Sequence, residues 1–155
     1  MTLSAMSRLF LFLVCIVVVP LSQAQSVAIG YPSAGSTISS SSNFTVEVDR
    51  PNSLTGSTEI SVIISLRPCT TSSGSIVCAS PTEEMGTVLY NGGYNPQYSD
   101  TGEEKPPHQN FSVAVPQGLE AGYALLSVGH VALVGAGNSP MFEVVYVDVQ
   151  IASSD

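Results

Sequence analysis

The sequence predicts an all-β protein, an immunoglobulin-like antiparallel β-sandwich of about seven strands. Short runs of β-branched and aromatic residues are separated by turns rich in Gly, Pro, Ser and Asn, and no run shows a sustained helical period. The runs follow one another at a spacing typical of a sandwich, without the intervening helices that would indicate a parallel sheet. A small β-barrel stays open as the alternative, because it has a similar pattern of short strands.

We expect the strands at residues 26–31, 44–49, 58–66, 85–90, 110–115, 123–134 and 141–151. Residues 44–49 and 110–115 alternate between apolar and polar side chains, as strands do when one face is buried and the other is in water. Residues 58–66 are apolar on both faces in their middle, which indicates a more central strand. The residues expected in the core are Phe44, Val46, Val62, Ile64, Phe111, Val113, Leu125 and Val131.

Two segments are predicted to be loops. Residues 33–42 are rich in Ser and indicate a surface connection. Residues 91–109 are long for a connection between strands, and long loops often carry function. This loop contains Tyr94 and Tyr98, which we expect to form the contact surface for any partner.

The start of the chain has the layout of a secretory signal peptide. A basic residue precedes an apolar run, and small residues stand three and one positions before an expected cleavage after Ala24. The apolar run has about half of the roughly 20 residues that a membrane-spanning helix needs. The carboxyl end also lacks the apolar tail that attachment of a glycosylphosphatidylinositol anchor requires. We therefore expect residues 1–24 to be removed and residues 25–155 to form a single secreted, extracellular domain without a membrane anchor.

The charge balance excludes two classes of partner. The full chain has a formal net charge of −8, and loss of residues 1–24 leaves only Arg50, Arg67 and Lys105 against 12 acidic residues. Nucleic acids and anionic lipids bind to basic surfaces. We expect no nucleic-acid partner.

Cys69 and Cys78 are the two cysteines outside the expected signal peptide. In an oxidising environment such a pair indicates one disulfide. The chain-entropy model gives roughly 2.5 to 3 kcal/mol for a closed loop of about ten residues. The enclosed loop is neutral and polar, so we expect a structural bond rather than a redox site.

Two segments, Asn43-Phe44-Thr45 and Asn110-Phe111-Ser112, match the N-glycosylation pattern. We expect sugars on Asn43 and Asn110. Each Asn lies at the start of a predicted strand, where a glycan would oppose edge-to-edge aggregation.

No group of residues predicts catalysis. His108 and His130 have no second type of ligand at metal-binding spacing, so we expect neither a metal nor another cofactor, and His130 is expected to be a packed or hydrogen-bonded strand residue. Glu83, Glu84 and the acids of residues 100–104 are typical of a solvated acidic surface. No serine stands in a nucleophile elbow. We expect no catalytic residues and no enzymatic activity.

Several segments resemble a family of small secreted fungal proteins, the necrosis-inducing secreted effector (NIS) family of plant-associated fungi. The similar segments are residues 31–32, 35–36, 49–51, 86–97, 109–116 and 130–137. The resemblance implies a non-enzymatic effector. It also implies that the target is a host protein, with suppression of plant pattern-triggered immunity through binding of immune receptor-associated kinases.

An extracellular carbohydrate-binding or cell-wall-associated module stays open as the alternative function. The sandwich fold and the tyrosines of residues 91–109 would also permit contact with a cell-wall polysaccharide. Fold class alone does not separate these two functions.

Overall fold

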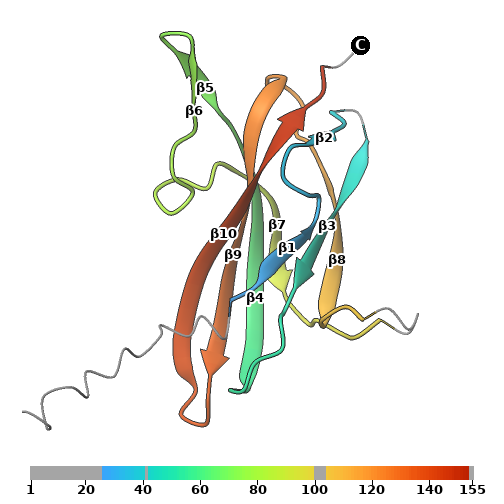
Figure 1. Cartoon of the computed structure of the whole chain (residues 1–155), viewed down its shortest axis with the longest axis vertical. Helices are drawn as coiled ribbons and strands as arrows, with labels where there is room; N and C mark the ends of the chain where they lie inside the picture. Colours follow the sequence, from blue (N-terminus) through green and yellow to red (C-terminus); the bar gives the residue numbers. More distant parts are fainter. Residues whose placement is uncertain (1–25, 41, 100–103, 154–155) are drawn as a thin grey trace, which may run out of the picture.

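The chain folds into two β-sheets that pack face to face, with a small hairpin at one end (Figure 1). This computed structural model describes residues 26–40, 42–99 and 104–153, so the predicted signal peptide lies outside the described residues. In the described ranges no helix is long and apolar enough to cross a membrane. The strands are β1 (Ala28–Tyr31), β2 (Ser36–Ile38), β3 (Asn43–Asp49), β4 (Ser57–Pro68), β5 (Thr70–Ser72), β6 (Ser75–Val77), β7 (Thr87–Gly93), β8 (His108–Ala114), β9 (Gly122–Val134) and β10 (Ser139–Ile151).

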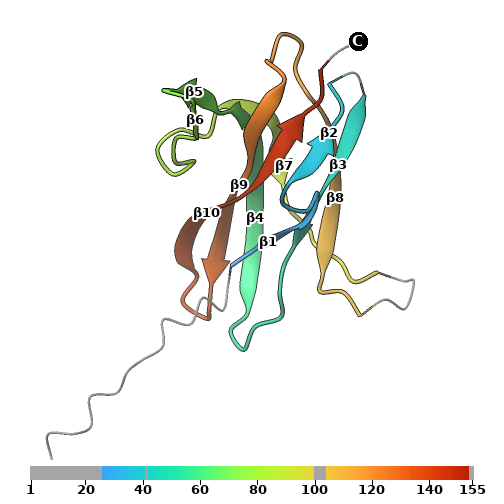
Figure 2. The same cartoon turned by 45° about the horizontal axis from the view of Figure 1, so that its top comes forward.

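The sheets have three and five strands. The smaller sheet has the order β1-β3-β8, the larger one β2-β10-β9-β4-β7, and β5 and β6 form a separate hairpin. Figure 2 shows β3 and β8 on one side of the molecule and the long β4, β9 and β10 on the other. Neighbouring strands run antiparallel except β2 and β10, which are parallel. The predicted antiparallel β-sandwich is confirmed. The barrel alternative is wrong, because both sheets stay open.

Three strands were not predicted. Strand β2 lies inside the Ser-rich residues 33–42, where its single large apolar side chain, Ile38, is 3% exposed and joins the core. Strands β5 and β6 lie inside the ring closed by the cysteines and are exposed along their length. Strands of three residues are too short to show a period, so the sequence pattern missed them.

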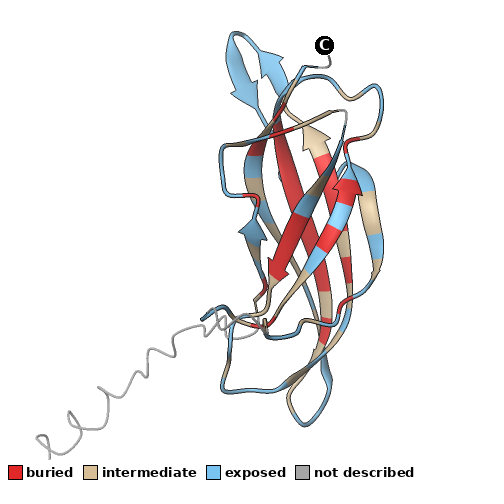
Figure 3. Ribbon diagram, turned by 90° about the vertical axis from the view of Figure 1, so that its right-hand side faces the viewer, coloured by how far each residue is buried: buried red, intermediate tan, exposed pale blue. Residues whose placement is uncertain are grey.

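The core lies between the two sheets, and Figure 3 shows the buried stretches in the middle of the long strands. The alternation of apolar and polar residues along the strands predicted much of this core. The expected core residues that are buried in it are Val46, Val62, Ile64, Phe111 and Val113. Phe44 is partly buried and packs against them.

The prediction for β9 was wrong about which face is inside. Leu126 and Val128 point into the core, whereas Leu125 is buried outside the core cluster and Val131 is only half-buried. Residues 123–134 are apolar on both faces, so a period of two could not choose between them. The outer face is partly covered by Met85, whose methyl group would lie 3.2 Å from a Cβ added at Gly129.

Candidate functional site

The structure separates the two tyrosines expected to form a contact surface. Tyr98 is 62% exposed, and its hydroxyl donates a hydrogen bond to Asn52 Oδ1 at 2.8 Å. Tyr94 is 4% exposed and belongs to the core, so its assignment to the contact surface is corrected. Only Tyr98 remains a candidate contact residue.

Tyr94 is buried because it follows β7 directly and turns inward between the sheets. Its hydroxyl donates to the carbonyl of Val48 at 3.1 Å. Its ring meets His130 edge-on, with centroids 5.5 Å apart, and lies 6.5 Å from the ring of Phe111. Burial raises the pKa of this phenol, and the Glu59 carboxylate raises it further. Tyr94 therefore links the β7–β8 connection to the interior.

The residues just before Tyr98 are tied to β8 of the sandwich. Gln97 and His108 exchange backbone hydrogen bonds of 3.0 and 2.9 Å, and the amide of Asn95 donates to Gln109 Oε1 at 2.7 Å. These bonds hold the start of the predicted loop against β8. The tyrosine is presented from an anchored backbone.

Behind this segment, His130 is buried between two carboxylates. The side chain is 1% exposed; Nε2 lies 2.5 Å from Glu59 Oε2, and Nδ1 lies 3.0 Å from Glu143 Oε1. The three residues come from β9, β4 and β10, so the contact joins three adjacent strands of the larger sheet. His130 is a hydrogen-bonded strand histidine, as expected from the sequence.

Each carboxylate also binds a segment outside its own sheet. Glu59 Oε1 accepts from Arg50 Nε at 2.8 Å, and Arg50 follows β3 of the smaller sheet. Glu143 Oε1 accepts from the amide of Val27 at 2.8 Å, and its Oε2 accepts from the hydroxyl of Ser26 at 2.6 Å. The network of Arg50, Glu59, His130 and Glu143 therefore connects the two sheets.

The network favours charged forms despite its burial. Desolvation alone would lower the pKa of His130, but the hydrogen bonds to Glu143 and Glu59 outweigh it and raise the pKa to about 9. Desolvation raises the pKa of Glu59, while the hydrogen bonds from His130 and Ser57 lower it more, to about 2. The pKa of Glu143 is also lowered, by its bonds to His130 and Ser26 against desolvation. At neutral pH an imidazolium thus lies between two carboxylates.

We call this part of the molecule the network end. It consists of the β3–β4 and β9–β10 connections, at the bottom of Figure 1, and of the described part of the β7–β8 connection, at its lower right. Its surface includes Tyr98 and Leu54, whose side chain is fully exposed in the β3–β4 connection. A pocket of about 340 Å³ lies between the start of β4 and the start of the β7–β8 connection, and it is lined by Arg50, Ser57, Thr58, Glu59, Tyr94, Asn95 and Pro96.

The imidazole of His130 lies out of reach of solvent, although Glu59 lines the pocket. A general acid or base must reach the reacting atom, and His130 has almost no exposed surface. Among residues 26–40, 42–99 and 104–153, no group of three or more His, Cys, Asp and Glu side chains is arranged to hold a metal ion. The network holds β4, β9 and β10 together next to the connections of the network end.

A second acidic group lies on the outer face of the smaller sheet. Glu47 pairs with Lys105, with Nζ 3.2 Å from Oε1. Burial raises the pKa of the neighbouring Asp49, and Glu47 raises it further. A Cβ added at Gly30 would lie 2.6 Å from both carboxylates, so the glycine of β1 lets these acids lie against its backbone.

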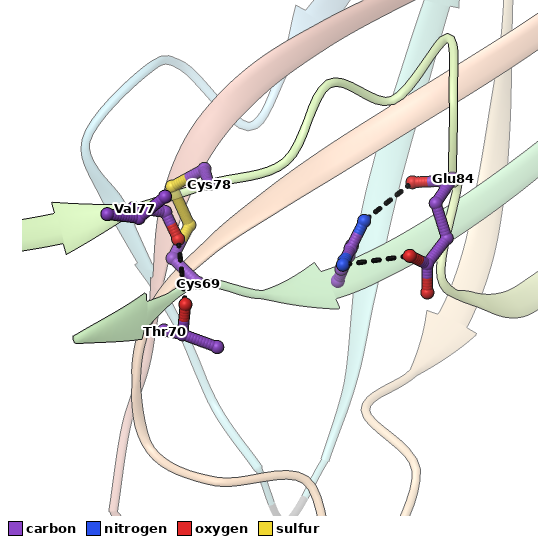
Figure 4. The surroundings of a disulfide bond; sticks show 6 residues. Cys69, Thr70, Val77, Cys78 and Glu84 are labelled. Atoms are coloured by element: carbon purple, nitrogen blue, oxygen red, sulfur yellow. Dashed lines mark hydrogen bonds and ion pairs between the residues drawn. A yellow bond between two sulfur atoms is a disulfide. The ribbon is translucent and has the colours of Figure 1, made fainter. Parts of the chain in front are cut away.

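The opposite end carries the disulfide, and we call it the disulfide end. Cys69 and Cys78 are joined at the base of the β5–β6 hairpin, as predicted. Figure 4 shows the bond beside the hairpin contact in which Thr70 Oγ1 donates to the carbonyl of Val77 at 3.4 Å. Nearby, Glu84 accepts from Arg67 at 2.9 Å, but its side chain is 66% exposed.

The predicted glycosylation sites lie on one surface. Asn43 of β3 and Asn110 of β8 are both exposed, next to Phe44 and Phe111, which point inward. They therefore share the outer face of the smaller sheet, and Asn43 Nδ2 donates to Ser112 Oγ at 3.3 Å. Glycosylation of these residues stays a prediction.

Comparison with known proteins gives one family. The model of the Nis1 family matches residues 22–150, which covers the whole sandwich apart from the end of β10. The chain belongs to the Nis1 family. This confirms the resemblance found in the sequence and places the chain in an effector-like family. No curated protein matches this chain.

The sequence did not predict the network of Arg50, Glu59, His130 and Glu143. One signal was present: Glu143 alternates with Val145 and Val147, which face the core, so the same period places its carboxylate inside. Glu59 gave no such signal, because a bulge between Glu59 and Ser61 shifts the register of β4 against β9.

Proposed function

We propose that this chain is a secreted effector that binds a host protein and has no enzymatic activity. Membership in the Nis1 family over residues 22–150 is the observation that carries this proposal. The buried His130 and the shallow pocket beside Glu59 support binding over catalysis.

The proposed host protein is a plant immune receptor-associated kinase, and the proposed effect is suppression of pattern-triggered immunity. This finer assignment rests on the resemblance to the effectors of plant-associated fungi. The surface proposed for the contact is the network end, because Tyr98 and Leu54 are exposed there on connections that the interior holds in place. Exposed aromatic anchors on a preorganised surface are typical of strong contacts between proteins.

Binding to a cell-wall polysaccharide has less support than it had from the sequence. A sugar platform needs exposed aromatic faces, and the burial of Tyr94 leaves only one of the two expected tyrosines at the surface of this segment.

A direct binding measurement tests the proposal. Purified residues 25–155 are titrated with the cytoplasmic domain of a plant receptor-associated kinase by calorimetry and, in parallel, incubated with chitin, glucan and cellulose. We expect saturable binding to the kinase domain and no retention on the polysaccharides. Retention on a polysaccharide without kinase binding would replace the effector proposal with the cell-wall one.

A further inference from the structure

Strand β10 has a long backbone edge with no partner strand among the described residues. On one side β10 pairs with β9 in an unbroken register, from Ser139 opposite Val134 to Ile151 opposite Gly122. On its other side β2 pairs only with Val149, Gln150 and Ile151. The stretch from 139 to 147 therefore presents one open side.

The bonds to the β2 segment show which residues point their backbone groups outward. The carbonyl of Asp148 accepts from the amide of Gly35 at 2.9 Å, and the amide of Ala152 donates to Ile38 at 2.9 Å. In an antiparallel strand both backbone groups of a residue point to the same side, and alternate residues share that side. Phe142, Val144 and Tyr146 therefore direct their amides and carbonyls to the open edge.

This edge has few of the features that keep sheet edges from pairing. Edges are normally short, bulged, charged or interrupted by Pro. Strand β10 has two such features: Pro140, which lacks an amide on the open side, and the inward-pointing carboxylate of Glu143. Strand β10 has 13 residues, no bulge in its pairing with β9, and no Lys or Arg between residues 139 and 151. The other edge, β7, has 7 residues and a register shift against β4. Ser26 and Val27 bind the Glu143 side chain rather than the backbone of β10.

We propose that the open edge of β10 pairs with the same edge of a second copy of this chain. In an antiparallel pair centred on Val144, Phe142 lies opposite Tyr146 of the second copy and Val144 lies opposite itself. Each of these residues then both donates and accepts a backbone hydrogen bond across the interface. The dimer continues the larger sheet across its two-fold axis.

The side chains along the edge match this register. Phe142 is 61% exposed and Tyr146 is 54% exposed on the outer face. In the dimer the ring of Phe142 lies next to the ring of Tyr146 of the second copy. No acid faces an acid: Glu143 lies opposite Val145, and Asp148 lies opposite Pro140. The predicted glycans on Asn43 and Asn110 lie on the other sheet and leave this edge uncovered. The edge thus offers self-complementary backbone hydrogen bonds, and this register sets no two acids directly opposite each other.

Sedimentation velocity of the secreted mature protein tests the dimer. We expect a concentration-dependent dimer, and Tyr146→Lys should raise its dissociation constant at least tenfold, a change of about 1.4 kcal/mol. Tyr98→Lys is the matched control, because it places the same charge at an exposed tyrosine away from the edge. Val144→Pro is a second variant, since it removes only an outward amide and proline is tolerated on edge strands.

Circular dichroism verifies that each variant is folded. A wild-type protein that stays monomeric up to about 1 mM, where an interaction is worth only about 4 kcal/mol, would overturn the proposal. A dimer that persists unchanged in both folded Tyr146→Lys and folded Val144→Pro would overturn it too.

Discussion

The two ends of the sandwich are held together in different ways. At the network end, Arg50, Glu59, His130 and Glu143 join three strands of one sheet to segments of the other through buried and partly buried charges. At the disulfide end, a single covalent bond closes one connection, with a sequence separation of 9 between Cys69 and Cys78.

The network and the disulfide differ in which parts of the chain they hold together. The network joins residues that are far apart in the sequence, so we expect a change at one of them to affect the whole end. The disulfide restrains only the hairpin that it encloses, which projects from the sandwich at the top of Figure 1. A contact surface made of several connections needs the first kind of support, which is why we place it at the network end.

Removal of a network carboxylate is expected to have the largest effect. Glu59→Ala leaves the imidazolium of His130 and the guanidinium of Arg50 without this partner, and breaking a buried ion pair typically costs about 3 to 5 kcal/mol. Chemical denaturation measures the loss. The control is Glu84→Ala at the other end, which removes an exposed pair and should cost less than about 1 kcal/mol. Equal losses of unfolding free energy in the two variants would show that the two ends do not differ in this way.

The stability of the network end should depend on pH. Because the pKa of His130 is raised to about 9, its stabilisation is complete below the unfolded value of 6.5 and is lost as pH rises through 9. Because the pKa of Glu59 is lowered to about 2, its stabilisation is present above 4.5 and is lost as pH falls toward 2. We expect the highest stability between pH 4.5 and 6.5. The alkaline loss should reach roughly 3 kcal/mol, the equivalent of the His130 shift.

Denaturation curves between pH 6 and 9.5 measure this loss, and His130→Gln supplies the comparison. The variant should be less stable but should have a flatter pH profile in that range, because no imidazole is left to release a proton. An alkaline decline as steep in His130→Gln as in the wild type would assign the pH dependence to other groups.

Opening the disulfide should have a smaller and more local effect. The double variant Cys69→Ala/Cys78→Ala should lose about 2.5 to 3 kcal/mol, the entropy of the closed loop. Hydrogen exchange should speed up in the hairpin between residues 70 and 77 and stay unchanged at His130. Faster exchange at the network end would show that the two ends are coupled after all.

The smallest effect on stability is expected at Tyr98. Its side chain is 62% exposed and makes one hydrogen bond, to Asn52, so Tyr98→Ala should change the free energy of unfolding by no more than about 0.5 kcal/mol. Thermal unfolding compared with the wild type measures this. A large loss would mean that Tyr98 supports the fold and is not available for contact alone.

Alternation predicted the parts of the fold in which one face of a strand is in water. It placed Val46, Phe111 and Val113 inside correctly, because polar neighbours on β3 and β8 mark the other face. It failed on β9, where both faces are apolar. It could not predict β2, because three residues of a Ser-rich run gain their order from pairing with the end of β10.

Less of the candidate site than of the fold could be predicted from the sequence. Exposure of Tyr98 was predicted from its long loop, but Tyr94 belongs to the same loop and is buried by its contacts with Val48, Phe111 and His130. The network depends on pairing between strands distant in the sequence and on the bulge beside Glu59. Such contacts are tertiary, so no local pattern encodes them.

The central claim is that the network end is the surface that binds the host protein. The most direct measurement is the affinity of Tyr98→Ala and Tyr123→Ala for the receptor-associated kinase domain, by calorimetry. Tyr123 is a matched control: it is 46% exposed and lies at the disulfide end, where its carbonyl accepts from the amide of Cys69. We predict that Tyr98→Ala weakens binding at least tenfold, about 1.4 kcal/mol, while Tyr123→Ala leaves it unchanged. Loss of binding in Tyr123→Ala with full binding in Tyr98→Ala would contradict the claim.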